Sequence, residues 1–271
     1  MPIKTNVWVF LRCYSAMHNK VAILAPEKLE QSMNRIVTGA IALVALLVIT
    51  HPASAASEDS IWASEVEVGA FYSTGNTDET NIKVRGEAVR DGEVYVNTYK
   101  LDLLNNSTDG TKTAQKTYGV FQLDRKLSDI SSIFGRAAYE DDKFSGFDYQ
   151  VDFTVGYSRE FLNSDIHQLK GSAGFGYRQS ELPSGMSEDE AIVRLAADYV
   201  WQVSDSATFK QGLSTQIGDV ATISRSETSL SADVLDNVAL KVALYIKNTS
   251  EVPVGTDKTD TETALTLLYK F

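Results

Sequence analysis

Few residues could carry out acid–base catalysis once the first part of the chain is set aside. Of the three histidines, His18 and His51 lie before residue 56, and His167 is the one that follows it. A serine or threonine nucleophile needs a base within hydrogen-bond reach, and histidine usually fills that role. Because His167 follows the predicted turn Asn163-Ser164-Asp165, we do not interpret it as a catalytic residue. The sequence therefore predicts no catalytic residues and no enzyme activity.

Carboxylates gather at two places that could bind a hard cation. Asp141-Asp142 with Asp148, and the run Glu188-Asp189-Glu190, offer the oxygen ligands that Ca²⁺ takes. The alternative is a solvated acidic loop, with a salt bridge to Lys143 at the first place, and we favour it. Transition metals prefer cysteine and histidine clusters, which this sequence does not offer after residue 56. We expect no metal and no cofactor.

The start of the chain has the pattern of an export signal. A short basic head at Met33–Arg35 precedes an uncharged apolar run over residues 36–49, and Ala53-x-Ala55 is a small-x-small cleavage pattern. The run is shorter than the roughly 20 apolar residues of a membrane-spanning helix. We predict a signal peptide at 33–55 and an exported domain at 56–271. Residues 1–32 are then an upstream mis-start or an extended head region.

Removing residues 1–55 makes the chain more acidic. The formal net charge changes from −11 to −14, because five basic and two acidic residues leave. A strongly acidic chain gives no support to nucleic-acid binding, which requires a basic face. The only cysteine, Cys13, leaves too, so the exported domain has no disulfide.

From Ile61 onward, hydrophobic residues recur with a period of two, which is typical of β-strands. For example, Tyr149, Val151 and Phe153 alternate with Gln150 and Asp152. The pattern predicts about twelve strands, near 61–73, 79–90, 93–104, 112–127, 131–142, 147–161, 166–179, 189–203, 206–218, 222–235, 238–248 and 258–271. The stretch from Ile223 to Val234 has the weakest pattern, because its centre is nearly all polar.

The predicted connections alternate in length. Short ones, such as Asp91-Gly92, Ser128-Asp129 and Asp236-Asn237, have tight-turn chemistry. The others are mostly longer, at 73–78, 105–111, 141–146, 180–188, 218–222 and 249–257. Short turns on one side and longer loops on the other, with an even strand count, are typical of an antiparallel up-and-down transmembrane β-barrel. We predict this all-β fold.

The last strand and the interior provide the remaining candidate residues. Leu265, Leu267, Tyr269 and Phe271 share one face of a strand that ends on an aromatic residue, like the assembly signal of a barrel's closing strand. The alternative is an edge strand of a soluble β-sandwich. Mixed charges at inward positions would form either a salt-bridge plug or the lining of a narrow aqueous pore; they are Asp152, Lys170, Arg178, Arg194, Asp198, Lys210, Lys241 and Lys247.

Several motifs resemble a family of salt-induced outer-membrane proteins. They are Gly75-Asn76-Thr77, the segment Asp142–Tyr149, Val155-Gly156-Tyr157 and Gly174–Arg178. The resemblance implies a β-barrel in the outer membrane of a Gram-negative bacterium, without catalytic residues, and a link to salt or osmotic stress. Its expected partners are outer-membrane lipid and lipopolysaccharide, with the barrel-assembly machinery and periplasmic chaperones during biogenesis.

Three functions follow from these observations. The first is a porin-like or structural outer-membrane barrel. The second is an outer-membrane enzyme acting on lipid or lipopolysaccharide. The third is a soluble exported β-sandwich that binds sugar or another protein, which would need its apolar faces buried against a second sheet.

Overall fold

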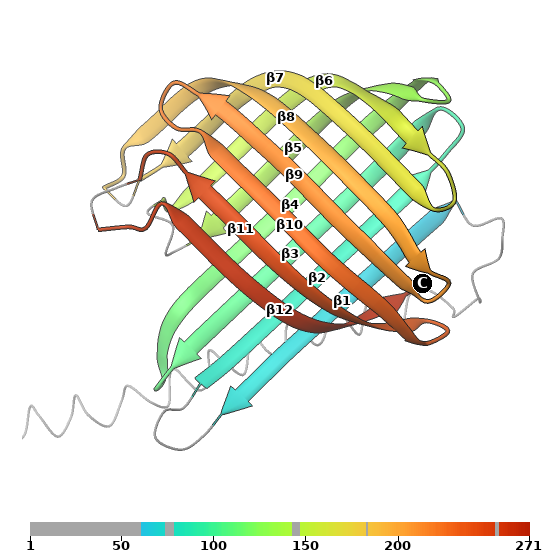
Figure 1. Ribbon diagram of the computed structural model, residues 1–271. Coiled ribbons are helices and arrows are strands. Elements are labelled where there is room, and N and C mark those ends of the chain that lie inside the picture. The colour runs from blue at the N-terminus through green and yellow to red at the C-terminus, as the bar shows by residue number, and fades with distance from the viewer. Residues whose placement is uncertain (1–60, 74–78, 143–146, 183, 253–254) are drawn as a thin grey trace, which may run out of the picture. The chain divides into compact units, whose positions relative to one another are not determined.

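A computed structural model describes residues 61–73, 79–142, 147–182, 184–252 and 255–271. The chain divides into two units, residues 1–57 and 58–271, and the second contains every described residue. Its elements are all strands (Figure 1): β1 Trp62–Ser73, β2 Glu79–Asp91, β3 Tyr95–Thr108, β4 Thr111–Ser128, β5 Ser131–Asp142, β6 Tyr149–Asn163, β7 His167–Glu181, β8 Ser187–Ser204, β9 Ala207–Gly218, β10 Ile223–Leu235, β11 Val238–Thr249 and β12 Thr259–Lys270. The predicted signal peptide, with Ala53 and Ala55, and the Gly75-Asn76-Thr77 motif lie outside the described residues, as does Lys143.

The strands form one closed barrel in which every strand pairs antiparallel with its neighbours in sequence (Figure 1). The ring closes where β1 pairs with β12. This seam is shorter than every other pairing in the described part of the chain: it joins Glu65–Val68 to Leu267–Lys270, and the Phe271 N–H then donates to the Ser64 carbonyl at 2.9 Å. The predicted twelve-strand barrel is confirmed, and the β-sandwich alternative is wrong because the sheet closes on itself.

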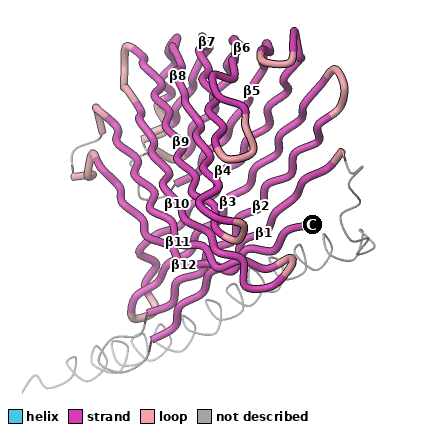
Figure 2. The backbone as a smooth tube through the Cα atoms, turned by 45° about the vertical axis from the view of Figure 1, so that its right-hand side comes forward, coloured by secondary structure: helices cyan, strands magenta, loops and turns pink. Residues whose placement is uncertain are grey.

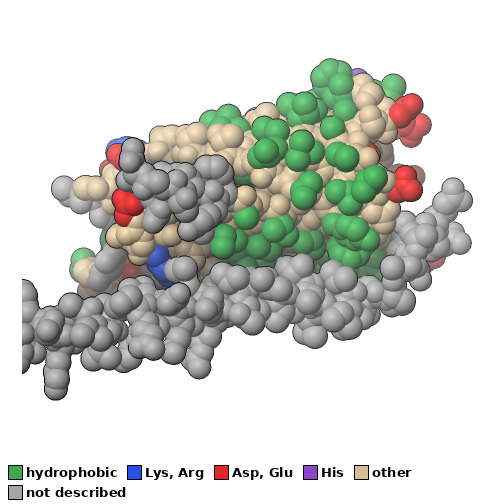
Figure 3. Space-filling view, turned by 90° about the horizontal axis from the view of Figure 1, so that it is seen from below, with side chains coloured by type: hydrophobic (Ala, Val, Ile, Leu, Met, Phe, Trp, Pro, Cys, Tyr) green, Lys and Arg blue, Asp and Glu red, His purple; other side chains and the backbone are tan. Residues whose placement is uncertain are grey.

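Each strand presents one face to the interior and one to the outside, because successive side chains point to opposite sides. On β5 and β6, for example, Arg136 and Asp152 are buried inside, whereas Ile133, Val151 and Phe153 are exposed outside. Figure 3 shows hydrophobic side chains gathered on the outer wall of the barrel. Within the described residues, no helix is long and apolar enough to cross a membrane.

The two ends of the barrel differ in their connections (Figure 2). At the turn end, where β1 begins and β12 finishes, the strands are joined by 92–94, 129–130, 164–166, 205–206 and 236–237. At the loop end, most connections are longer, and they are 74–78, 109–110, 143–148, 182–186, 219–222 and 250–258. The predicted alternation of connection lengths therefore holds, with one exception.

The exception is the predicted loop at 105–111, which is wrong. Strand β3 continues to Thr108 and β4 begins at Thr111, so only Asp109 and Gly110 connect them. Both have positive φ, 50° and 73°, and an Asp-Gly pair with two positive φ angles makes a tight hairpin turn. Asn105-Asn106-Ser107, which resemble turn residues, are consequently paired within the hairpin, with a register shift between Asn106 and Ser107.

A repeated hairpin unit accounts for the turn end. Register shifts occur at Lys126/Ser128, Glu160/Leu162, Gln202/Ser204 and Asp233/Leu235, each next to a turn-end connection. Such β-bulges place one extra residue on one strand and bend it. Three of these bulges fall within the sequence segments 126–130, 161–166 and 234–238, which share the order apolar, turn, apolar.

An aromatic band lies around the outside of the turn end. Trp62 stacks on Tyr99, which in turn contacts Phe121, and Trp201 meets Phe209 edge-on. Bands of this kind are typical of the level where a barrel meets the membrane–water interface.

A close approach inside the barrel explains two glycines. Phe134 is 4% exposed and points inward from β5. A Cβ on Gly156 would lie 2.7 Å from the Phe134 Cζ atom, and one on Gly174 would lie 3.1 Å from it. The ring therefore packs directly against β6 and β7 backbone, which requires glycine at both positions.

Candidate functional site in the barrel lumen

The interior of the barrel contains a cavity of about 760 Å³ lined by charged side chains. Inward-facing positions on all twelve strands supply the lining, because the period-two alternation aims every second residue at the axis. The charged residues that border it are Glu65, Arg85, Glu87, Lys100, Asp102, Lys116, Asp124, Arg136, Asp142, Lys170, Arg194, Asp198, Lys210, Arg225, Glu227, Lys241, Lys247, Asp260 and Glu262.

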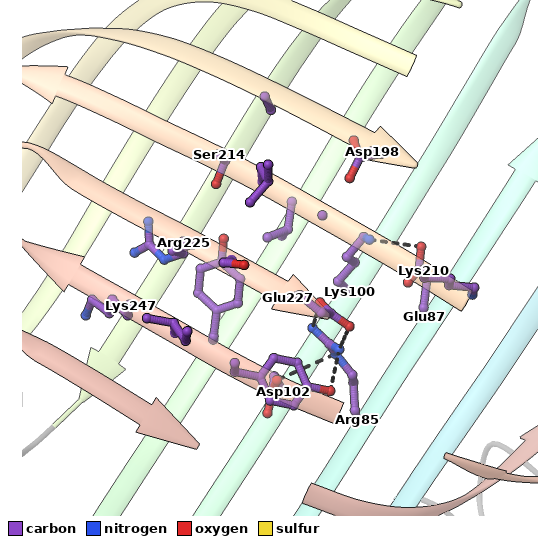
Figure 4. A pocket seen from close by; sticks show the side chains of 18 of the residues that line it. Arg85, Glu87, Lys100, Asp102, Asp198, Lys210, Ser214, Arg225, Glu227 and Lys247 are labelled. Atoms are coloured by element: carbon purple, nitrogen blue, oxygen red, sulfur yellow. Dashed lines mark hydrogen bonds and ion pairs between the residues drawn. The ribbon is translucent and has the colours of Figure 1, made fainter. Parts of the chain in front are cut away.

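Ion pairs cross the cavity at mid-height. Arg85 on β2 donates two hydrogen bonds to Glu227 on β10, at 2.5 and 2.9 Å, and lies 3.5 Å from Asp102 (Figure 4). Lys241 on β11 binds Glu67 at 2.8 Å and lies 3.4 Å from Glu227. Glu67 and Lys241 are 2% and 4% exposed. Each neutralises the charge of the other, because an unpaired charge at this depth would be costly to bury.

A second crossing lies nearer the loop end and has Glu140 at its centre. The Glu140 carboxylate binds Lys247 at 2.8 Å, Arg225 at 2.5 Å and Lys116 at 3.3 Å. Glu140 belongs to β5 and Lys247 to β11, which are six places apart in the closed order of twelve strands. This cluster therefore joins opposite walls, and it narrows the lumen.

The cavity is more open toward the turn end. Lys100, Lys210 and Lys170 keep about two-fifths of their side-chain area exposed (40%, 45% and 37%), and each pairs with one carboxylate. Their partners are Glu87 at 3.0 Å, Glu65 at 3.5 Å and Asp124 at 3.2 Å, respectively. Figure 4 shows the first of these pairs, Lys100 with Glu87. These lysines are therefore available to water and to ions inside the barrel.

Arg194 and Asp198 also face this region from β8. Arg194 contacts the Ser172 hydroxyl at 3.5 Å, and within the described residues neither side chain lies within 4.0 Å of an oppositely charged group. Figure 4 shows Asp198 above Lys100 and Lys210.

The structure brings most of the predicted lumen residues to this cavity. Lys170, Arg194, Asp198, Lys210, Lys241 and Lys247 border it. Asp152 and Arg178 point inward too but are held in the wall, by Arg136 at 2.5 Å and by Glu190 at 2.5 Å.

Sequence reasoning missed other members of the site, above all Glu67, Arg85, Glu140 and Glu227. The alternation Lys83-x-Arg85-x-Glu87 is a signal for inward charges on β2. The ion pairs that cross the lumen join residues far apart in the sequence, so no local sequence pattern predicts them.

Glu190 is part of a buried clamp and not of a solvated loop. The predicted acidic loop Glu188-Asp189-Glu190 is wrong, because β8 begins at Ser187. Glu190 accepts hydrogen bonds from Arg178 Nε at 3.0 Å and from the backbone N–H groups of Val220 and Ala221 at 2.8 and 3.3 Å. It thereby fixes the 219–222 connection to the barrel wall.

The other candidates for chemistry lie apart from the lumen charges or at its margin. Among the described residues, no group of three or more His, Cys, Asp or Glu side chains is placed to hold a metal ion. Asp141 and Asp142 end β5, and Asp142 borders the cavity. His167 begins β7 on the outer face, where its ring stacks on Tyr199 and Trp201 and its Nδ1 lies 2.9 Å from the Tyr199 hydroxyl.

The four residues of the predicted assembly signal all lie on the outer face of the barrel. Leu265, Leu267, Tyr269 and Phe271 are between 37% and 62% exposed, and the rings of the last two meet edge-on at 4.7 Å. Leu268 lies on the opposite face of β12, 3% exposed inside the barrel and paired with Ala239.

A family model described as "Protein of unknown function, DUF481" matches residues 66–271. The chain belongs to this family. A curated relative in the comparison, "Uncharacterized protein YdiY" from Escherichia coli (strain K12), is 27% identical over 223 residues, which cover 82% of this chain and 87% of the relative. The family resemblance predicted from sequence motifs is thus confirmed as a barrel family of unknown function.

Solved outer-membrane barrels are similar in fold. The NanC porin has a TM-score of 0.47 at 11% identity, covering 76% of this chain and 98% of that one. The translocator domain of autotransporter NalP from Neisseria meningitidis has 0.46 at 8%, covering 89% and 98%. The COG4313 outer membrane channel from Pseudomonas putida F1 has 0.46 at 10%, covering 82% and 99%.

The location of the protein follows from its two surfaces. In a bilayer, only helices and closed barrels satisfy every backbone hydrogen-bonding group, and the outer face of this closed barrel is apolar while its interior is charged. The protein is therefore an integral barrel of the outer membrane of a Gram-negative bacterium.

Proposed function

We propose that this DUF481 barrel is a narrow, water-filled channel for small ions and small polar solutes. The observation that supports the proposal is the charged cavity of about 760 Å³ along the lumen. Charged side chains in a barrel interior hold water, because ions that are not fully paired need hydration. The exposed amines of Lys100, Lys170 and Lys210 provide such groups.

The crossing ion pairs make the proposed channel narrow. Barrels of eight strands are filled by side chains and those of sixteen leave an aqueous channel, so twelve strands lie between the two cases. Here the Glu140 cluster and the Arg85–Glu227 pair occupy part of the cross-section. The path that remains suits hydrated ions better than large solutes.

Conductance of single molecules in planar lipid bilayers tests the proposal. Purified protein that is folded, as judged by heat-modifiable gel migration, should give small, uniform current steps in KCl. Folded protein that inserts into the bilayer and carries no current would show that the barrel has a structural role instead. Membrane fractionation provides the accompanying check, and protein found soluble in the periplasm would contradict an outer-membrane channel.

Ion selectivity tests the part that Glu140 plays. Glu140→Gln removes the carboxylate that binds Lys247, Arg225 and Lys116, so three cations lose their shared partner. The reversal potential in a KCl gradient should shift toward anion selectivity. Asp205→Asn, the same change of charge at the exposed turn between β8 and β9, is the matched control and should shift it far less. Equal shifts in the two variants would remove Glu140 from the ion path.

The proposal extends to a role in salt or osmotic stress and to partners. The stress link rests on the family resemblance, and growth of a deletion strain in raised NaCl, with and without the restored protein, tests it. Outer-membrane lipid and lipopolysaccharide are the expected surroundings of the apolar wall. The barrel-assembly machinery and periplasmic chaperones are the expected partners during insertion.

A further inference from the structure

The outer face of β9 and β10 carries a polar strip. The strip consists of Gln211 and Thr215 on β9 with Ser224, Ser226 and Thr228 on β10. It begins directly next to the aromatic band, because Gln211 pairs with Thr228 and the next outward pair toward the turn end is Phe209 with Leu230. The strip therefore occupies the middle of β9 and the loop-end half of β10.

The neighbouring strands are mostly apolar at the positions paired with the strip. Opposite the strip, the outward residues of β8 are Leu195, Ala197 and Tyr199, and those of β11 are Leu244, Ile246 and the polar Asn248. The strip thus has mostly apolar residues on both sides. Its polar composition is also the reason why the sequence pattern of this stretch is the weakest in the chain.

Polar side chains in hydrocarbon need hydrogen-bond partners, which lipid tails cannot supply. The strip meets part of this need internally. Thr228 donates to the Gln211 side-chain oxygen at 2.7 Å, Gln211 donates to the Ser226 hydroxyl at 3.1 Å, and the Thr215 and Ser224 hydroxyls lie 3.1 Å apart. Within the described residues, the Ser226 hydroxyl accepts one bond here while its own hydrogen stays available to an outside acceptor.

A hollow of about 400 Å³ lies in the wall beside the strip. It exists because the small residues Ala197, Ser224 and Ser226 are bordered by the larger Leu195, Leu213 and Ile246. Small residues at a membrane-buried surface let two backbones approach closely, and hydroxyls hydrogen-bond across the contact. This sector consequently combines a recess, small side chains and hydrogen-bonding groups.

We propose that the β9–β10 face binds a second copy of this chain, so that the barrel is a dimer. Barrels in one membrane all insert in the same direction, so a symmetry axis between copies runs along the membrane normal. Each residue at the interface then contacts residues of the second copy that lie at the same depth in the membrane. A two-fold axis places the polar strip against the same strip of the second copy, where each hydroxyl finds both donors and acceptors. Head-to-tail contact would instead place it against a different sector of the wall.

Cysteine cross-linking in outer membranes tests this interface. Ser226→Cys places a thiol near the proposed axis, and a residue on a two-fold axis can cross-link to itself. Leu101→Cys is the matched control, because Leu101 points outward from mid-strand on β3, six places from β9 in the closed order. Mild oxidation should give a band of twice the chain mass for the first variant and none for the second. The protein without an added cysteine reports any contribution from Cys13.

Three results would overturn the proposal. They are the absence of a self-cross-link in folded Ser226→Cys, an equal yield in Leu101→Cys, and cross-linking of Ser226→Cys only to a protein of different mass. The mass of the unmodified protein in mild detergent provides an independent measurement. It should be that of two chains, and Ser226→Leu, which fills the recess and removes the hydroxyl, should reduce it to one chain. A single-chain mass for the unmodified protein, with tightly bound lipid in the recess, would assign the face to lipid instead.

Discussion

Replacement of Glu190 by glutamine should destabilise the barrel more than the removal of any single surface charge. The Arg178 side chain is 1% exposed. Its Nε–H and Nη2–H groups donate hydrogen bonds to the Glu190 carboxylate at 3.0 and 2.5 Å. The same carboxylate accepts hydrogen bonds from the backbone N–H groups of Val220 and Ala221. An amide at this position would leave the guanidinium unneutralised and would turn an N–H₂ group toward one of these donors.

The expected size follows from the burial of both partners. Removal of one member of a buried ion pair typically costs about 3–5 kcal/mol, because the other charge is left without compensation. We expect about 3 kcal/mol for Glu190→Gln, at the lower end of the range for a buried pair, because the amide oxygen can still accept one hydrogen bond. Glu188→Gln, the same chemical change two residues earlier on a less buried side chain, should cost below about 0.5 kcal/mol.

Urea unfolding of the barrel in lipid vesicles, followed by the fluorescence of Trp62 and Trp201, provides the assay. A second comparison separates charge from packing. The double variant Arg178→Met/Glu190→Leu removes both charges, and apolar replacement of a buried pair is often neutral, so it should recover most of the loss. A midpoint for Glu190→Gln equal to that of Glu188→Gln, or a double variant as unstable as the single one, would refute the reasoning.

Three further predictions concern the wall and the closing strand. In Gly156→Ala the new Cβ would lie 2.3 Å from the Ala173 carbonyl oxygen, so the urea midpoint should fall by the equivalent of about 1–3 kcal/mol, whereas Gly135→Ala, with open space around its Cβ, should unfold like the parent. Phe271→Ser should lower the amount of inserted barrel in outer-membrane fractions without changing the conductance of the molecules that insert, and normal insertion would contradict an assembly role. His167→Ala should lose stacking worth about 0.5–1.5 kcal/mol and leave lipid composition unchanged, so altered lipids would revive an enzymatic role.

Most of the fold could be predicted from sequence because the barrel has two chemically opposite surfaces. Strand β6 shows this: Val151 and Phe153 face outward, Asp152 and Thr154 face inward, and the alternation is visible in the residue order itself. The turns were predictable for the same reason that they form, since Asp, Asn, Ser and Gly adopt turn conformations at low cost.

The remaining errors have physical causes. Asn105-Asn106-Ser107 has turn-forming residues, yet the positive φ angles at Asp109 and Gly110 place the reversal further along the chain. The partners of Glu140 lie on β4, β10 and β11, and the last two reach it only after the sheet has closed. No local pattern encodes that meeting, so the centre of the candidate site emerges only in three dimensions.

The ion pairs across the lumen also constrain the order in which the strands assemble. Glu67, Lys83 and Arg85 on the first two strands are paired with Lys241, Glu262 and Glu227 on the last three. A nascent chain that has inserted only its early hairpins would bring Glu67 toward the membrane without its counterion, at a steep free-energy cost. Lys83 and Arg85 would share the single carboxylate of Asp102 on β3, at 3.9 and 3.5 Å. Stable partial barrels are therefore disfavoured, and the arrival of β10–β12 neutralises the interior and closes the ring in a single late step. The ion pairs that narrow the finished lumen would thus also favour the complete barrel over partially assembled ones.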